Sequence, residues 1–507
     1  MWLFFLKFPD RLNFVNTTML KTIRRFLYLI LLWNGLFPLR SYSWNVVTLN
    51  EAINVWALHS NEARAAALRY RNELLSYANY RKGLLPSLSF QVSPVSLNHS
   101  LRQLQDASGG DYRYIDDYAN SSSAGFTLQQ SVGWTGGTLT AGSNVMFLRE
   151  FSRNRNSFST NVFTLGYSQP FWGGHRRFRL NDAAQHMANR LSVRNYCTEV
   201  SAAQRQALAL YLDAFLYKLE HDLARRSLAI EDTLLRVAAV KRREGYLTAY
   251  DYNQVELQLL HTRFACEEAG RDYRTACRRL ADYLGMVDSV AVAEPSDTLP
   301  RVVDASLFLQ QVRRNNPTAL TQELQLLQAD AAWFEADLVT RFNGTVSLHY
   351  GLNQYAEHLA DAYRRPINSQ SVSVSLQIPV FQWGINRNKR RMAEYKRQET
   401  QLEVETARRT FESSLYEQVD GYNSSTSMTA IARRSYLLAC DQYSLLVRKF
   451  ALGSVSVYEL TSARKEQHSA LKQYYESLRR QYETYYALRH LALYDFVRQE
   501  DLADRYL

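Results

Sequence analysis

The chain has 507 residues, of which 46% are hydrophobic and 21% charged, and its formal net charge is +11 at pH 7. This length allows two to four ordinary domains, yet no Pro-, Gly- or Ser-rich linker divides the sequence. Part of the positive charge lies in the first 43 residues, and elsewhere basic and acidic residues are interleaved along predicted helices. Such interleaving favours a solvated helical surface over a stripe that binds nucleic acid.

The first predicted element is a secretory signal peptide within residues 1–43. Basic residues precede an apolar run over 26–33, and Ser41-Tyr-Ser43 supplies small residues for cleavage. The apolar run is shorter than the roughly 20 residues of a membrane-spanning helix. We therefore expect cleavage near Ser43 rather than a retained anchor, with an upstream extension before Met19 if translation starts there.

Two halves of similar organisation follow. The first, 44–285, is predicted to contain a helix over 49–82, strands within 86–170, a long helix over 176–243 and a helix over 248–284. A linker over 286–303 leads to the second half, 304–496, with a helix over 304–341, strands within 344–380, a long helix over 388–450 and a helix over 455–496. Residues 497–507 form a tail.

The long helices set the architecture. Between Arg176 and Arg243 there is neither Pro nor Gly, and apolar residues recur at steps of three and four. At 1.5 Å per residue such a helix spans about 100 Å, so two shorter helices lying end to end are needed to flank it. An antiparallel helix pair buries only one seam, and the remaining apolar stripes require neighbours from the other half or from other chains.

Two landmarks recur at an offset of about 208 residues, which indicates an internal duplication. The first is a glycine turn between two helices: Lys241-Arg-Arg-Glu-Gly245-Tyr-Leu-Thr-Ala-Tyr-Asp251 and Arg448-Lys-Phe-Ala-Leu-Gly453-Ser-Val-Ser-Val-Tyr-Glu459. The second is the exit from a strand: Tyr167-Ser-Gln-Pro170-Phe-Trp-Gly-Gly174 and Leu376-Gln-Ile-Pro379-Val-Phe-Gln-Trp-Gly384.

The strand regions alternate apolar residues with small polar ones, as in Leu88, Phe90 and Val92 or Val372 and Val374. This alternation is typical of barrel strands with lipid on one face and water on the other, although a half-buried sheet of a soluble domain has the same pattern. Four strands cannot close a barrel, and lipid does not tolerate an open edge. Three chains of four strands would give twelve.

Two segments add to this count. Residues Ala124 to Leu148 are interpreted as a further strand pair around Gly136-Gly137 that extends the sheet or forms a loop. Residues Asn98 to Ser123, rich in Ser, Asp and Tyr, are interpreted as an external loop.

Together these features resemble the TolC family of outer-membrane efflux proteins over nearly all of the mature chain. The motifs that carry the resemblance are Leu84-Leu-Pro86-Ser-Leu-Ser-Phe90, the two strand exits and the two glycine turns, in the same order twice. The resemblance implies a mainly α fold with β structure: duplicated long-helix hairpins that form a helical tunnel, and four or more strands in a shared, trimeric, twelve-stranded barrel. It implies no cofactor.

The resemblance also implies partners and sites. Family members are homotrimers in the outer membrane that dock a periplasmic adaptor and work with an inner-membrane pump of the RND or ABC type. The residues expected to dock the adaptor are Gly245, Tyr246, Leu247, Leu452, Gly453 and Ser454. A plain structural interpretation of both glycines is a left-handed helix C-cap.

A periplasmic gate is expected at the acids Asp251 and Glu459, for which an exposed acid at a helix N-terminus is the open alternative. The sequence departs here from the best-known family pattern, because Phe450 replaces a tyrosine, Val455 an arginine and Ser462 an aspartate. We hypothesise that Arg242 pairs with Glu459 and holds the tip closed.

Three classes of function remain at this stage. The preferred one is a passive exit duct for drug efflux or type I secretion, and the second is a periplasmic coiled-coil adaptor or scaffold. An enzyme is least expected, because the histidines lack metal-binding spacing and no hydrolase or phosphate-binding motif is present. The four cysteines are scattered and are interpreted as packing residues.

Overall fold

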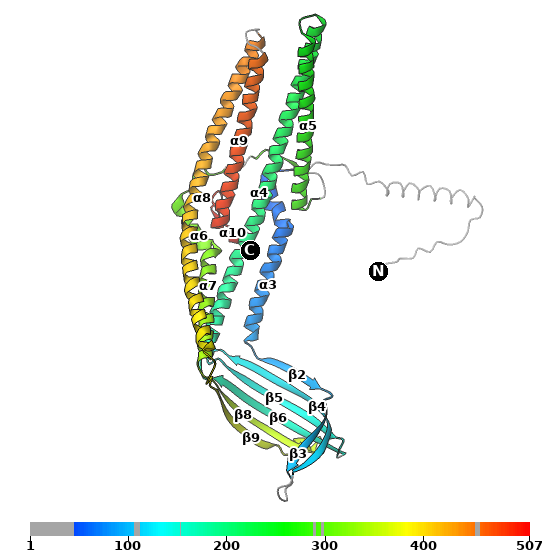
Figure 1. The fold of residues 1–507 in the computed structure, drawn as a ribbon, viewed down its shortest axis with the longest axis vertical. Coiled ribbons are helices and arrows are strands. Elements are labelled where there is room, and N and C mark those ends of the chain that lie inside the picture. The colour runs from blue at the N-terminus through cyan, green and yellow to red at the C-terminus, as the bar shows by residue number, and fades with distance from the viewer. Residues whose placement is uncertain are drawn as a thin grey trace, which may run out of the picture.

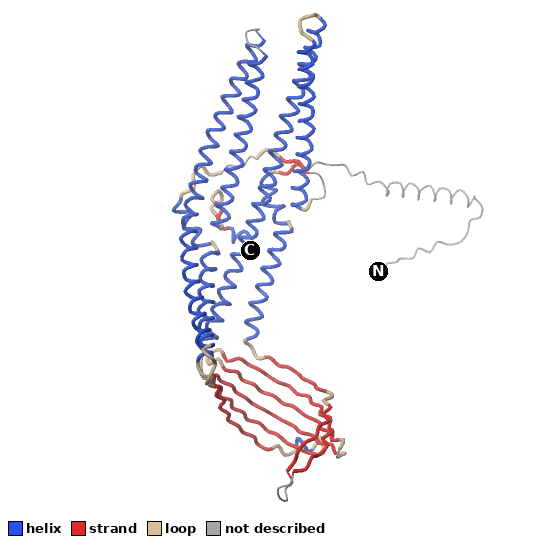
Figure 2. Tube along the Cα trace, in the orientation of Figure 1, coloured by secondary structure: helices blue, strands red, loops and turns tan. Residues whose placement is uncertain are grey.

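The computed structural model describes residues 45–105, 112–152, 154–286, 290–295, 299–451 and 457–506. The predicted signal peptide lies outside them. A long bundle of helices carries one sheet at its end (Figures 1 and 2). The main helices are α3 (Asn61–Gly83), α4 (Gly174–Arg243), α5 (Ala249–Leu284), α6 (Ala305–Asn315), α7 (Pro317–Thr340), α8 (Ile385–Ala451) and α9 (Val457–Ala492).

Each long helix has two shorter helices beside it. Helix α4 contacts α3 near the sheet and α5 toward the far tip, and α8 contacts α7 and α9 in the same way. Figure 1 shows both sets running parallel, with the two helical tips at the end opposite the sheet. The arrangement of two short helices along one long helix is therefore as predicted from the lengths.

The two opening helices are not continuous, in contrast to the prediction. The first is divided into α2 (Leu49–Glu51), a π-helical turn and a 3₁₀ turn before Ser60, which caps α3 by accepting a hydrogen bond from the amide of Ala63. The second breaks at Asn316, because Pro317 lacks the N–H that would continue helix α6. Asn316 caps α7 instead.

The predicted linker is partly ordered into structure near the middle of the bundle. Within it, β7 (Val290–Val292) pairs in parallel with β1 (Asn45–Val47), so the start of the first half and the linker form one small sheet. The hydroxyl of Tyr211 on α4 donates to the carbonyls of Val47 and Ala293, at 3.0 and 2.9 Å. These bonds attach the small sheet to the long helix.

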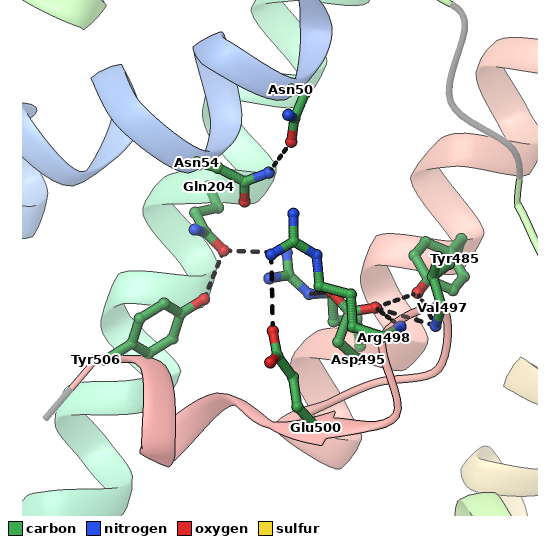
Figure 3. Close-up of polar contacts among 10 residues, drawn as sticks. Asn50, Asn54, Gln204, Tyr485, Asp495, Val497, Arg498, Glu500 and Tyr506 are labelled. Atoms are coloured by element: carbon green, nitrogen blue, oxygen red, sulfur yellow. Dashed lines mark hydrogen bonds and ion pairs between the residues drawn. The ribbon is translucent and has the colours of Figure 1, made fainter.

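The tail folds back onto the bundle through β10 (Tyr494–Asp495), β11 (Glu500–Asp501) and α10 (Leu502–Tyr506). Figure 3 shows Tyr506 donating to Gln204 of α4 and Tyr485 of α9 donating to Asp495. Between them the guanidinium of Arg489, 2% exposed, donates to Gln204 and lies 3.3 Å from the carboxylate of Asp495. The tail thus covers a buried charge at the junction of the two halves.

The larger sheet is antiparallel and contains strands from both halves. Its strand order is β2–β4–β5–β6–β8–β9, and β3 pairs with the outer part of β4. The bounds are β2 (Ser87–Ser93), β3 (Leu97–Gln105), β4 (Tyr112–Val132), β5 (Gly137–Glu150), β6 (Arg155–Pro170), β8 (Asn343–Ala356) and β9 (Ile367–Gln377). The described strands satisfy the prediction of four or more.

The strand pair predicted around Gly136-Gly137 is present as β4 and β5, in register from Val132 opposite Gly137 to Ala119 opposite Glu150. The interpretation of Asn98 to Ser123 as an external loop was wrong for the described residues of this segment, 98–105 and 112–123, which are strands. Strand β3 and the first part of β4 pair with each other there, from Leu97 opposite Asn120 to Gln105 opposite Tyr112. Hydrogen bonding between the two backbones stabilises strands here, although the polar sequence lacks the alternation from which strands are predicted.

Candidate functional site

The sheet has one apolar face. Because directly opposed residues of an antiparallel pair point to the same side, the register identifies the members of each row. One row across all six positions of the strand order contains Leu88, Leu128, Ala141, Leu165, Tyr350 and Gln370. Further rows add Phe90 with Phe126, and Tyr167 with Leu348 and Val372. At the two edges, Leu88 is 68% and Val372 72% exposed.

The opposite face carries small and hydroxylated residues. The neighbouring row across the same strands contains Ser89, Thr127, Gly142, Thr164, Gly351 and Ser369. Another contains Ser87, Gln129, Thr140, Gly166, His349 and Ser371. One face therefore suits hydrocarbon and the other suits water, which is the alternation of a transmembrane barrel wall.

The strand exits join this sheet to the long helices. Pro170 is the last residue of β6, and Gly173 takes the left-handed conformation (φ +75°) before Gly174 begins α4. In the second half Pro379 follows β9, and Gly384 (φ +81°) precedes α8. Both exits need a residue in the left-handed conformation, which glycine adopts without steric cost.

A junction of ion pairs lies just beyond the exits. Arg177 of α4 makes two 2.6 Å bonds to the carboxylate of Glu335 on α7. Asp337, 7% exposed in its side chain, accepts from Arg341 at 2.9 Å and lies 3.0 Å from Arg390 of α8. The bidentate pair links α4 to α7, and the carboxylate of Asp337 links α7 to α8, so these ion pairs hold the helix ends together next to the sheet.

The first tip is a tight helical turn. Helix α4 ends in paired hydrogen bonds from the amide of Tyr246 to the carbonyl of Lys241 and from Gly245 to Arg242, the pattern of a Schellman motif with glycine in the left-handed conformation. Gly245 has φ +80°, and a Cβ there would meet nothing within 4 Å. Tyr246 is 79% exposed. The turn is open to an approaching partner.

The predicted gate residues of this tip have local partners. The guanidinium of Arg242 lies 4.8 Å from the ring centroid of Tyr252. Thr248 caps α5 by accepting from the amide of Asp251 at 3.1 Å, and its hydroxyl donates to the carboxylate of the same residue. Asp251 therefore stands half-buried in the first turn of α5, beside the N-cap residue Thr248.

The second tip is only partly described. Leu452, Gly453 and Ser454 lie outside the described residues, as does the side chain of Phe450. Glu459 stands in the first turn of α9, and both it and Ser462 are exposed.

Sequence reasoning missed a seam of ion pairs between the two halves. Each pair joins an acid of α4 to a base of α9: Glu231 with Arg464 at 3.2 Å, Glu220 with Lys472 at 2.7 Å and Asp213 with Arg479 at 2.7 Å. The first pair is nearest the tips and is buried, with side-chain exposures of 9% and 12%. The sequence signal is three basic residues of α9 at steps of eight and seven, Arg464, Lys472 and Arg479. Other charged residues on the same helix make this spacing hard to recognise.

Among the described residues, no group of three or more His, Cys, Asp or Glu is placed to hold a metal ion. No described helix is long and apolar enough to cross a membrane.

Part of the chain matches a known protein family. Residues 308–492 match the family model described as outer membrane efflux protein. The whole fold is similar to the CmeC outer membrane channel of Campylobacter jejuni, at 12% identity and TM-score 0.62 over 99% of this chain and 98% of that one. The family match thus lies within the second half of the chain, and the likeness to the CmeC channel shows a shared fold. No curated protein sequence gives a significant match.

Two further solved channels share the fold of this chain. VceC of Vibrio cholerae is 11% identical with TM-score 0.61 over 88% of this chain and 95% of that one. The open state of MtrE of Neisseria gonorrhoeae is 16% identical with TM-score 0.57 over 88% of both chains. At these identities the likenesses show a shared fold.

Proposed function

We propose that this protein is an outer-membrane efflux protein, the passive exit duct of a tripartite efflux or type I secretion system. Substrate enters from an inner-membrane pump, of the RND or ABC type, and leaves across the outer membrane. The energy is supplied by the pump, because an open aqueous tunnel has no means of driving transport.

The two faces of the sheet carry this proposal. A surface of Leu, Phe, Val and Tyr on one side and of Ser, Thr and Gly on the other needs lipid outside and water inside. The sheet of one chain is open, and unsatisfied edge amides are not tolerated in lipid. A homotrimer that closes the sheet satisfies both requirements, and its helices continue as a tunnel through the periplasm.

The tips supply the contact with a periplasmic adaptor. The tight turn at Gly245 leaves the ring of Tyr246 exposed, with Leu247 half-buried next to it, and Leu452, Gly453 and Ser454 are the matching residues in the sequence of the second half. With threefold symmetry Glu459 contributes three carboxylates around one axis, a ring suited to cations and to a charge-sensitive gate. We assign Arg242 as its partner in the closed state.

Site-specific photo-crosslinking tests the adaptor contact. A photoreactive phenylalanine analogue at Tyr246 is expected to capture the periplasmic adaptor encoded with the pump, when the full chain is expressed with that adaptor in a Gram-negative host. The control position is the exposed Leu402 on α8, far from the tip. Equal capture at both positions, or none at Tyr246, would contradict docking at the tip.

A further inference from the structure

The hairpin β4–β5 stands between the two strands that directly follow α3 and precede α4. The sheet runs β2–β4–β5–β6 rather than from β2 straight to β6. We infer that this hairpin is a working part of the membrane wall, so that a trimer builds an eighteen-stranded barrel in place of the twelve strands expected above. The inference rests on the proposed trimeric duct.

The hairpin has the two-faced pattern of its neighbours. Thr127 and Thr140 lie on the Ser/Thr face, while Phe126 and Ala141 lie on the apolar face. On the apolar face one row runs through Leu88, Leu128, Ala141 and Leu165, from β2 through β4 and β5 into β6, and on the opposite face Ser89, Thr127, Gly142 and Thr164 do the same. A hairpin that lay inside the pore or outside the membrane would have no reason to repeat this division.

The inner turn of the hairpin is bonded to both sides of the junction. The amide of Gln130 donates to the carbonyl of Leu84, after α3, at 2.6 Å. On the other side the hydroxyl of Tyr167 donates to the Thr135 hydroxyl at 2.8 Å, and Gln169 donates to the Thr135 carbonyl at 2.9 Å. Gln169 belongs to the strand-exit motif, so the exit itself is built to hold this turn.

The sheet edges permit closure by a second copy. Strand β2 runs away from the helices and β9 runs back toward them, so β9 of one copy and β2 of the next meet in antiparallel fashion. Both edges place apolar residues on the same face, with Leu88 on one and Val372 on the other. Each described chain contributes six strands along this path, and three copies make eighteen.

The larger ring also fits the helical tunnel. Strands about 4.8 Å apart and tilted by about 40° each cover roughly 6 Å, so eighteen cover about 110 Å and twelve about 75 Å. Four helical rods from each of three chains, spaced by about 8–10 Å, cover roughly 100–120 Å. At this tilt the eighteen-stranded ring matches the tunnel above it. Its wide lumen, in the size class of porins, suits bulky hydrophilic cargo.

Thiol accessibility in the assembled outer-membrane protein tests the inference. The calibrators are Thr164→Cys and Leu165→Cys on β6, which lines the wall under either count. We expect a membrane-impermeant cationic methanethiosulfonate to label Thr164→Cys and to spare Leu165→Cys. The test pairs are Thr127→Cys with Phe126→Cys on β4, and Thr140→Cys with Ala141→Cys on β5. The same division, at least tenfold in labelling rate, is expected for both.

The outcomes separate the two proposals. If the two β6 variants differ in labelling rate but the two β4 variants and the two β5 variants do not, the hairpin is outside the wall. The eighteen-stranded barrel is then overturned while the duct stands. If Thr164→Cys and Leu165→Cys are labelled at the same rate, the duct is overturned as well. As a check on closure, Ser89→Cys combined with Ser373→Cys is expected to give covalent trimers on oxidation. Only uncross-linked monomer would contradict edge pairing.

Discussion

Gly136, in the turn between β4 and β5, lies directly against the backbone of Gly174, the first residue of α4. A Cβ on Gly136 would overlap the carbonyl carbon of Gly174, and Gly136 also has φ +72°. Neighbouring Gly133 meets the ring of Phe178 in the same manner. The turn between β4 and β5 and the start of α4 are thus in direct backbone contact, with no room for a side chain at Gly136.

Replacing Gly136 by alanine is expected to prevent correct assembly. The added methyl group collides with backbone rather than with a flexible side chain, and the left-handed conformation adds a cost of about 1 kcal/mol. We expect the folded trimer in the outer membrane to fall at least fivefold on a semi-native gel. Gly285→Ala is the matched control, because it has φ +71° but open space around its Cβ position. Similar trimer levels for the two variants would show that the close approach is unimportant.

The buried seam pair predicts a stability effect near the tips. Glu231→Ala leaves the guanidinium of Arg464 buried without its carboxylate, which we expect to cost about 3 kcal/mol. The measurement is urea unfolding of the detergent-solubilised protein, followed by loss of helical circular dichroism. Asp232→Ala, which breaks the exposed pair with Arg236, is expected to cost under about 1 kcal/mol. Equal effects would mean that burial of the seam contributes nothing.

Arg242→Ala tests the proposed gate. Removing the guanidinium is expected to raise conductance in planar bilayers and to admit large antibiotics that the native channel excludes, because the closed state loses its partner for Glu459. Arg243→Ala, at the adjacent exposed position, serves as the control. Unchanged conductance and unchanged exclusion in Arg242→Ala would refute the pairing, leaving Arg242 with its observed contact to Tyr252.

The pH dependence of stability should reflect His490. Burial, and to a lesser extent Arg205, lowers the pKa of its imidazole to about 4, from about 6.5 in an unfolded chain. Between these values the unfolded state binds more protons, so the contribution of His490 to stability is lost as pH falls from about 6.5 toward 4. His490→Gln should therefore flatten the melting temperature profile over that range. A profile as steep as that of the native protein would contradict this assignment.

Much of the architecture could be predicted from the sequence because it follows from periodicity and duplication. The absence of Pro and Gly over 176–243 predicted a helix that is observed as α4, and the alternation around Leu88 and Val372 predicted two-faced strands. The glycine turn at Gly245 was predicted from its place between two helices. Each of these features is local, so the residues that determine it are adjacent in the chain.

Features that depend on distant contacts were not predicted. The strand character of residues 97–105 and 112–120 arises from backbone pairing across the sheet, which a Ser-, Asp- and Tyr-rich composition does not reveal. The approach of Gly136 to Gly174 and the bond from Gln169 to Thr135 require knowledge of the strand order. The seam from Glu231 to Arg464 joins residues on different halves, and interleaved charges look alike whether they meet a partner or solvent.

The most direct measurement is the assembly state in the outer membrane. The chain is expressed from Met19 in a Gram-negative host, the membranes are separated, and the outer-membrane fraction is run on a gel with and without heating. A shared barrel predicts a heat-sensitive trimer in that fraction, because strand pairing between copies resists detergent but not heat. A monomer or dimer in the soluble periplasmic fraction would contradict the duct.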